Sequence, residues 1–215
     1  RLLDTLPFIG KSETDIQEFE DEQVELAYDN SYYVKGFAPI QPVDEYNEEN
    51  SLLFVTTQGI VKRVALNLFE NINKNGKIAV ILKDGDMLYD VKKTSGDEEV
   101  FLASSKGKVC RFNEQDVRAM GRTASGVKSM NLREDDVAVC MDIATNDEDL
   151  LVISENGYGK RTPLTQYKRQ NRGGVGLITY KISEKTGKLV GATMCKEDDE
   201  LMLINSSGVA IRINV

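Results

Sequence analysis

The chain has 215 residues, of which 40% are hydrophobic and 7% aromatic, and it contains no histidine and no tryptophan. The lack of histidine excludes catalytic triads and zinc sites built on imidazole, together with the usual proton shuttle near neutral pH. The formal net charge of -8 argues at first against a nucleic-acid partner, but the charge is unevenly distributed along the chain.

The acidic residues are concentrated at the start of the chain. Residues 1–50 hold 13 acidic and 3 basic residues, which leaves 22 acidic and 24 basic residues in the remainder. Most of the excess lies in residues 11–30, which contain eight carboxylates and one lysine. A block of this kind is typical of a solvated insertion. We predict strands at residues 1–9 and 32–40, with residues 11–30 as a flexible acidic insertion between them.

Cysteine usage and hydropathy predict a cytoplasmic protein. No apolar run approaches the ~18 residues that a membrane span requires. The three cysteines, Cys110, Cys140 and Cys195, lie far apart beside apolar residues, which favours buried free thiols over a metal site and fits a reducing compartment. The chain begins at Arg1 rather than at a methionine, so we expect a fragment of a longer protein.

Four hairpins repeat one pattern: an apolar strand, a turn that ends in glycine, and a strand with an arginine four residues after that glycine. They span residues 52–63, 100–111, 150–161 and 201–212. The turn glycines, at spacings of 48, 50 and 51 residues, are Gly59, Gly107, Gly157 and Gly208, and the arginines are Arg63, Arg111, Arg161 and Arg212. A repeat of about fifty residues is typical of blade-like units.

Two more strand-like segments follow each of the first three hairpins. They are 77–83 with 87–93, 127–132 with 137–144, and 176–183 with 189–195. Four strands per unit, separated by turn residues, predict an all-β, propeller-like fold. We expect one domain of about four blades, at approximately residues 1–76, 77–126, 127–175 and 176–215, which is either a small ring or part of a larger disc.

A basic loop follows each of these three hairpins. Fifteen residues after the turn glycine stand Lys74, Arg122 and Arg172, and further glycines follow each of them. Cations beside accessible backbone amides form an arrangement that binds phosphate. Because blades repeat a position around a common axis, we expect these three cations to be exposed on one perimeter. The competing interpretation is an ordinary solvated loop.

Two stretches of sequence resemble a known family. Residues 157–176, GYGKRTPLTQYKRQNRGGVG, and residues 112–136, FNEQDVRAMGRTASGVKSMNLREDD, are similar to the C-terminal domains of the A subunits of bacterial DNA gyrase and topoisomerase IV. The resemblance runs from about residue 50 to the end. It implies a β-pinwheel, a propeller-like disc whose blades exchange strands and around whose basic rim DNA bends. The box that reads Q-x-R-G-G-K-G in the gyrase family has Val175 in place of its lysine here.

The resemblance also implies a function and partners. This chain would be a non-catalytic domain that binds and wraps double-stranded DNA, without a cofactor. Strand cleavage and ATP hydrolysis would belong to the rest of the A subunit and to the ATPase B subunit of a type II topoisomerase, an isomerase. The residues expected to contact DNA are Lys74, Arg118, Arg122, Lys128, Lys168, Arg169, Gln170, Arg172, Gly173 and Gly174. No segment resembles a recognition helix, so binding should tolerate any sequence and depend on bendability.

Two questions stay open at this point. The overall acidity also fits a different function, a propeller-type platform that binds protein partners. If the parent protein is instead the A subunit of topoisomerase IV, the resemblance implies that this domain senses DNA geometry. The four hairpin arginines could contact DNA or pair with the acidic turns that precede each hairpin, and the sequence favours neither.

Overall fold

The computed structural model describes residues 46–71, 77–145, 147–205 and 207–215. The predicted strands at 1–9 and 32–40, the acidic insertion 11–30 and the candidate Lys74 therefore lie outside the described residues. The strands are β1 Ser51–Thr56, β2 Ile60–Ala65, β3 Leu88–Thr94, β4 Glu99–Ser104, β5 Lys108–Asn113, β6 Val127–Lys128, β7 Ala138–Ala144, β8 Asp149–Ser154, β9 Gly159–Pro163, β10 Leu177–Ile178, β11 Leu189–Cys195, β12 Glu200–Ile204 and β13 Ala210–Asn214. Three short 3-10 turns, η2 Leu66–Phe69, η3 Glu114–Asp116 and η4 Leu164–Gln166, follow the first three hairpins.

All four predicted hairpins are present. They are β1–β2, β4–β5, β8–β9 and β12–β13, and each is antiparallel. The glycine that ends each turn has a positive φ, for example 72° at Gly59 and 78° at Gly107, a conformation that residues with a Cβ rarely adopt. The described part of the chain holds no helix long and apolar enough to pass through a membrane. The prediction of an all-β fold is confirmed.

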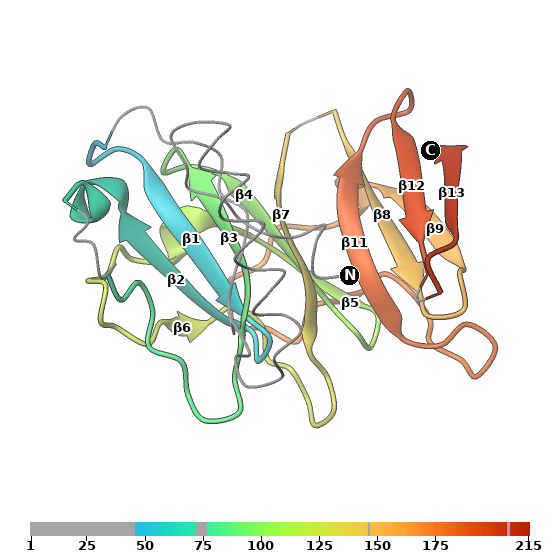
Figure 1. Ribbon diagram of the computed structural model, residues 1–215, viewed down its shortest axis with the longest axis horizontal. Coiled ribbons are helices and arrows are strands. Elements are labelled where there is room, and N and C mark those ends of the chain that lie inside the picture. The colour runs from blue at the N-terminus through green and yellow to red at the C-terminus, as the bar shows by residue number, and fades with distance from the viewer. Residues whose placement is uncertain (1–45, 72–76, 146, 206) are drawn as a thin grey trace.

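The sheets exchange strands between successive units. The first sheet has the order β3-β1-β2-β6 and the second the order β10-β5-β4-β7 (Figure 1). Although β6 follows β5 in the chain, it pairs with β2 of the preceding hairpin; β10 pairs in the same way with β5. The described residues form a third sheet, β11-β8-β9, and a two-stranded sheet, β12-β13. This strand exchange is the defining feature of a β-pinwheel, as the resemblance implied. We call the edge that carries β6 and β10 the rim edge.

The strands at the rim edge are shorter than the sequence predicted. Segment 77–83 contains no strand, 127–132 only β6 and 176–183 only β10. The chain leaves the sheet after two residues because the amide and the hydroxyl of Ser129 both donate to the Gly59 carbonyl, at 2.9 and 2.7 Å. The amide of Thr179 donates in the same way to the Gly107 carbonyl at 2.9 Å. The turn of the preceding hairpin thus ends each of these strands.

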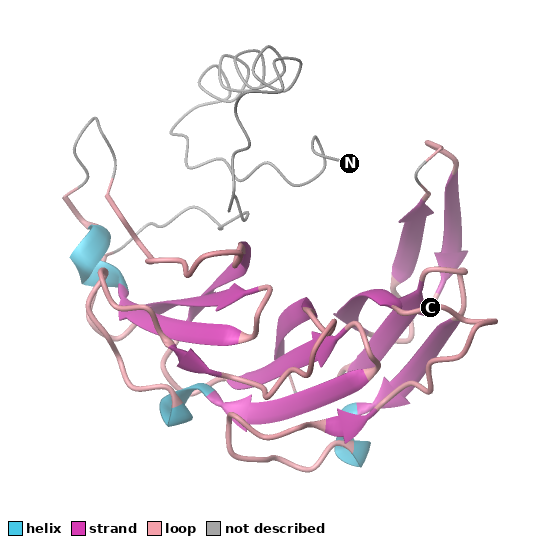
Figure 2. Ribbon diagram, turned by 90° about the horizontal axis from the view of Figure 1, so that it is seen from below, coloured by secondary structure: helices cyan, strands magenta, loops and turns pink. Residues whose placement is uncertain are grey.

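Successive sheets pack face to face along an arc, as Figure 2 shows. Period-2 alternation sends Leu53 and Val55 of β1 into the layer between the first two sheets, while Leu52 and Phe54 cover the opposite face. On β4, Leu102 faces the first sheet and Phe101 faces the third. The strands β1 and β4 therefore have two buried faces, which explains why each reads as a nearly continuous apolar run. The three cysteines are free and buried, as predicted.

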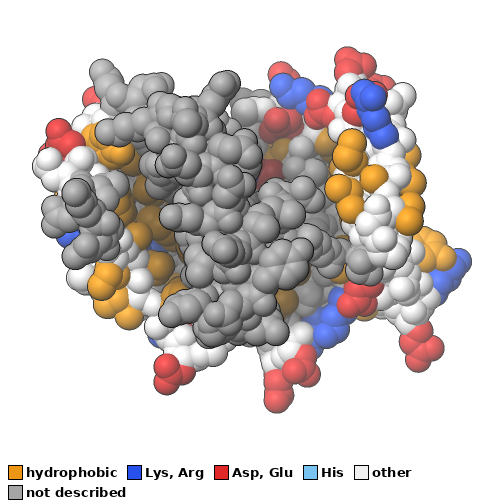
Figure 3. Space-filling model, viewed as in Figure 1, with side chains coloured by type: hydrophobic (Ala, Val, Ile, Leu, Met, Phe, Trp, Pro, Cys, Tyr) orange, Lys and Arg blue, Asp and Glu red, His pale blue; other side chains and the backbone are white. Residues whose placement is uncertain are grey.

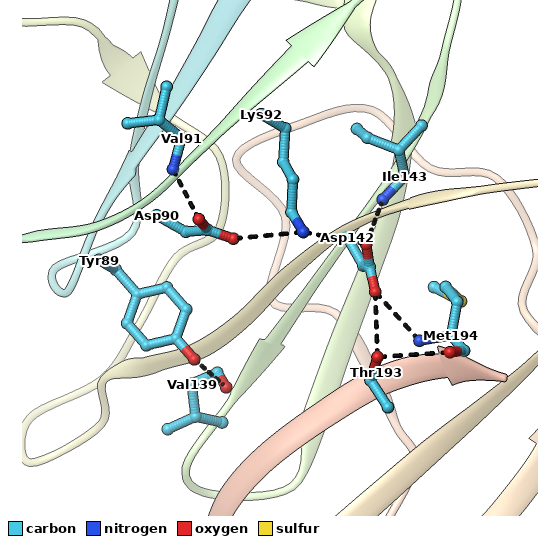
Figure 4. Close-up of polar contacts among 9 residues, drawn as sticks. All are labelled: Tyr89, Asp90, Val91, Lys92, Val139, Asp142, Ile143, Thr193 and Met194. Atoms are coloured by element: carbon cyan, nitrogen blue, oxygen red, sulfur yellow. Dashed lines mark hydrogen bonds and ion pairs between the residues drawn. The ribbon is translucent and has the colours of Figure 1, made fainter. Parts of the chain in front are cut away.

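The edges opposite the rim are joined by polar side chains, drawn in Figure 4. Lys92 of β3, Asp142 of β7 and Thr193 of β11 occupy equivalent positions, because they pair with Leu53, Phe101 and Leu151 of the three central strands. Lys92 Nζ lies 3.5 Å from Asp142 Oδ1 and 3.7 Å from Asp90 Oδ2. Asp142 Oδ2 accepts a hydrogen bond from the Met194 amide at 3.0 Å and from the Thr193 hydroxyl at 3.4 Å.

The protonation of this group follows from burial and from the two carboxylates. Burial raises the pKa of Asp90 despite the opposing charge of Lys92. Burial alone would lower the pKa of Lys92, but Asp142 and Asp90 outweigh it and raise that pKa. Lys92 is therefore a stable cation that links three successive sheets through Asp142.

Candidate nucleic-acid interface

The loops that follow the second and third hairpins lie against the preceding sheet at the rim edge. The amide of Met120 donates to the Arg63 carbonyl of β2 at 2.8 Å, and the amide of Gln170 donates to the Arg111 carbonyl of β5 at 2.8 Å. The two contacts are equivalent, since Arg63 and Arg111 hold the same hairpin position. The strand exchange thus also fixes the two basic loops, residues 117–126 and 167–176, in one place relative to their sheets.

Glycines allow this close approach. A Cβ built on Gly126 would lie 2.6 Å from the Val61 carbonyl oxygen, and one built on Gly176 would lie 2.8 Å from that of Val109. Both glycines precede a rim strand and have positive φ, 88° and 71°. Their lack of a side chain serves the contact between one unit and the hairpin of the unit before it.

Arg122 and Arg172 occupy equivalent positions, but they are half-buried rather than fully exposed. Arg122 Nη1 donates to the Ile78 carbonyl at 3.4 Å. Arg172 Nη1 donates to the Lys128 carbonyl at 3.3 Å, and its Nε donates to the Asp116 carbonyl at 2.8 Å. The sequence prediction of solvent exposure is wrong in degree, because each guanidinium also donates to backbone carbonyls of the protein.

The exposed cations at the rim edge are Arg118, Lys128, Lys168 and Arg169. Arg118 and Lys168 each stand eleven residues after a turn glycine, so they occupy the same position in successive repeats. The repeat pattern predicted from the sequence did not include this position. Neither forms an ion pair with a carboxylate of the described residues. In the first unit the same position is an exposed glutamate, Glu70. Arg169 Nη1 lies 3.5 Å from Glu99 Oε1, a contact at an exposed site that is weak in water.

The other predicted contact residues, Gln170, Gly173 and Gly174, form hydrogen bonds within the protein through their backbones. The amide of Gly173 donates to the Ser129 carbonyl at 2.7 Å, so it is not available to a phosphate. The carbonyl of Gly174 accepts from the Asn131 amide at 2.8 Å. The side-chain oxygen Oε1 of Gln170 is buried without a hydrogen-bond partner among the described atoms.

Three hairpin arginines pair with the acidic residue that opens their own hairpin. The Arg111–Glu99 distance is 2.9 Å and the Arg161–Asp149 distance 3.2 Å, and Arg212 pairs with Glu200. Of the two interpretations that the sequence left open, this geometry supports the structural one.

Arg111 extends this role across units. Its Nη1 donates to the carbonyls of Leu164 and Tyr167 at 3.3 and 3.1 Å, and its guanidinium lies 5.5 Å from the centre of the Phe101 ring. It therefore holds η4 of the next unit against the second sheet.

The family model for the DNA gyrase C-terminal domain, beta-propeller, matches residues 50–95, 98–139, 148–196 and 199–215. The DNA gyrase A subunit of Staphylococcus epidermidis (strain ATCC 12228 / FDA PCI 1200) is 44% identical over 174 residues, which are 80% of this chain and 20% of that protein. The DNA gyrase A subunit of Ureaplasma parvum serovar 3 is 43% identical over 176 residues, 82% of this chain and 21% of that protein. The chain spans about a fifth of the length of these relatives.

Two solved structures share the fold. The C-terminal domain of DNA topoisomerase IV matches with a TM-score of 0.77 and 27% identity, over 81% of this chain and 55% of that one. A DNA gyrase A C-terminal domain matches with a TM-score of 0.73 and 30% identity, over 87% of this chain and 63% of that one.

Proposed function

Because this chain belongs to the DNA gyrase C-terminal domain family, we propose that it binds and bends double-stranded DNA within a bacterial type II topoisomerase. It contributes no chemical step of its own. Strand cleavage, ATP hydrolysis and the resulting supercoiling belong to the rest of the A subunit and to the B subunit, with which this domain acts in the cytoplasm. Because the relatives named above are gyrase A subunits, gyrase is favoured over topoisomerase IV as the parent enzyme.

The observation that carries this proposal is the recurrence of exposed cations at the rim edge. Arg118 and Lys168 share one repeat position in successive units, and Lys128 and Arg169 lie beside them in the same two loops and rim strand. Duplex DNA carries one negative charge per ~1.7 Å of its axis, so a surface that bends it must offer cations at repeated intervals. The sheets follow one another along an arc (Figure 2), so a position that repeats from unit to unit recurs along the rim. In this proposal the predicted blades form a single DNA-bending domain over residues 1–215.

Arg122 and Arg172 have a double role in this proposal. Each guanidinium joins two units through backbone carbonyls and presents its open side to a phosphate. With no base-reading element at the rim, the domain selects DNA by its bendability and not by base sequence.

Binding of duplexes of increasing length, measured at several salt concentrations, tests the proposal. Affinity should rise with length until the duplex spans the arc, and it should fall steeply as salt rises, since each neutralised phosphate releases counterions. End-to-end energy transfer in a doubly labelled duplex should show that the two ends approach one another. Binding without bending would contradict the proposal.

The overall acidity of the chain, a formal net charge of -8, favours a second candidate function, a platform for a protein partner. Figure 3 shows acidic side chains at several places on one face of the described residues. A domain with this function alone would not bind duplex DNA even at low salt.

A further inference from the structure

One lysine of the first sheet is buried and forms no ion pair with the residues that the structure describes. Lys62 lies on β2 opposite Phe54, and only 1% of its surface is exposed. Lysine is almost never fully buried unless it is paired, because desolvation of an ammonium group is costly. No carboxylate of the described residues lies within ion-pair distance of it. Such a residue needs an explanation beyond packing.

The ammonium group is held by two backbone carbonyls from different parts of the chain. Nζ donates to the Ala79 carbonyl at 2.7 Å and to the Arg122 carbonyl. The second acceptor belongs to the basic loop 117–126, which carries Arg118 and Arg122. A Cβ on Gly126 of the same loop would lie 3.2 Å from the Cβ of Lys62, so the loop also packs directly on this side chain.

On the described segments that hold Lys62 and its two acceptors, the charged side chains all have its own sign. β1 carries no charged residue, and the charged side chains on β2, on residues 77–83, on loop 117–126 and on β6 are Arg63, Lys77, Lys83, Arg118, Arg122 and Lys128. Burial, reinforced by the charge of Arg122, lowers the pKa of Lys62 from 10.5 to about 8. The side chain therefore titrates at a pH where the rim arginines keep their charge.

The fold itself does not need a lysine at this position. By strand register, Lys62 corresponds to Cys110, Lys160 and Ile211 in the other three hairpins. Cys110 is fully buried, whereas Lys160 is exposed and donates to the Thr179 carbonyl at 3.2 Å. What distinguishes Lys62 is that it is buried beneath a basic loop and bonded to that loop's backbone.

We propose that Lys62 is a positioning residue for DNA binding: through the Ala79 and Arg122 carbonyls it fixes the loop that presents Arg118 and Arg122 to the duplex. This role rests on the proposed function. Lys62 does not touch phosphate, since it is buried under the loop. Phosphates beside Arg122 offset the repulsion between the two cations, so bound DNA favours the protonated form of Lys62. DNA affinity should then fall as pH rises through the range in which free Lys62 loses its proton.

The test compares the wild-type chain with Lys62→Met, which keeps the length of the side chain and removes its donors. Lys160→Met is the matched control at the equivalent strand position. Affinity for a labelled duplex is measured over a series of salt concentrations, and again from about pH 7 to about pH 9.5, where unperturbed lysines and arginines keep their charge. Hydrogen exchange of the free proteins compares the Met120 and Ala124 amides in loop 117–126 with the Gln170 and Gly173 amides in loop 167–176.

We expect Lys62→Met to weaken binding about five- to tenfold, as for lost charge-assisted hydrogen bonds, and Lys160→Met to change it by less than about twofold. The slope of log affinity against log salt should stay at its wild-type value in Lys62→Met, because no phosphate contact is lost. The wild-type affinity should fall with pH across the range and the Lys62→Met affinity should not. Exchange should become faster at Met120 and Ala124 only.

Each contrary result is decisive. Unchanged affinity in Lys62→Met, or a salt slope reduced by about one unit as for a lost phosphate contact, would overturn the positioning role. If Lys62→Met does not fold, the wild-type pH profile decides alone, and a flat profile rejects the role. If the wild-type chain and Lys62→Met bind duplex DNA equally well, the positioning role is rejected but the proposed DNA-binding function stands. A wild-type chain that binds no duplex refutes the proposed function and this role with it.

Discussion

Lys92 on β3 and Asp142 on β7 occupy equivalent positions in successive units, yet their side chains form an ion pair with a 3.5 Å separation of Nζ and Oδ1. The two equivalent positions thus hold a cation and an anion, whereas two cations or two anions at these positions would repel one another. Asp142 also accepts a hydrogen bond from the Met194 amide of β11. The Asp142 carboxylate therefore connects the sheets that contain β3, β7 and β11.

Asp142→Ala should destabilise the fold by about 1–3 kcal/mol, since it leaves the Met194 amide without its acceptor and the half-buried Lys92 ammonium with Asp90 alone. Urea unfolding measures the change. The exposed Asp198→Ala serves as the control, with an expected effect within ~0.5 kcal/mol. Equal stability of the two variants would show that the carboxylate does not hold the sheets together.

Arg118→Ala combined with Lys168→Ala should weaken duplex binding and lower the salt slope by about one unit per residue, because each removes one phosphate contact. Thermal unfolding should be nearly unchanged. Lys83→Ala, an exposed lysine outside the proposed site, controls for the loss of net charge. A double variant that keeps the wild-type slope would place the DNA elsewhere on the surface.

Gly176→Ala and Gly157→Ala separate steric contact from backbone strain. Both glycines have positive φ, 71° and 78°. A Cβ on Gly157 meets nothing within 4 Å, whereas one on Gly176 would lie 2.8 Å from the Val109 carbonyl oxygen. Gly157→Ala should cost about 1 kcal/mol of unfolding free energy from strain alone, and Gly176→Ala clearly more. Similar losses in denaturant titration would mean that β10 does not need the close approach.

Arg111→Met should destabilise the domain by about 2–3 kcal/mol, because two carbonyls of the next unit lose their charged donor and Glu99 keeps only its weaker contact with Arg169. The corresponding Arg212→Met breaks only an exposed pair with Glu200, so its cost should be below about 1 kcal/mol. Calorimetric unfolding of the two variants provides the comparison. Equal losses in the two variants would show that the contacts of Arg111 with the next unit do not add to the stability of the domain.

The stability difference between the wild-type chain and Lys62→Met should depend on pH. The pKa of Lys62 is about 8 in the folded protein and 10.5 for the unperturbed side chain. Between these values the unfolded chain binds more protons than the folded one, so the wild-type stability should rise with pH relative to Lys62→Met and be constant below the folded pKa. Urea midpoints of both proteins across this range measure the effect. A difference that is flat with pH would show that Lys62 has an unperturbed pKa.

The hairpins could be predicted from the sequence because their determinants are local. A turn glycine and an arginine four residues later recur at spacings close to fifty residues, and the first strands of the first two hairpins, β1 and β4, are largely apolar because both of their faces are buried. The rim strands could not be bounded in the same way. Residues 127–132 read as one strand, but the Gly59 carbonyl of another unit ends that strand after Lys128, and no local pattern contains this contact.

The candidate site was predicted in its residue types but not in its contacts. Repeat spacing located Arg122 and Arg172 correctly in the two loops, while their half-buried state depends on carbonyls from a neighbouring unit. Strand exchange among the described residues was implied by the family resemblance alone, since the choice of pairing partner for β6 is invisible in its two residues. The buried Lys62 gave no signal, because a lysine on a strand reads as exposed until its neighbours are known.

The strand exchange also bears on how such a chain changes in length during evolution. The second and third units each supply one short strand, β6 and β10, to the hairpin before them. An in-frame duplication or deletion of one whole repeat therefore leaves every remaining hairpin with a pairing partner of the same kind. A break inside a repeat instead separates a hairpin from the strand that completes its neighbour. Descendants of such a gene can differ in the number of blades, provided that the copied segment is a full period.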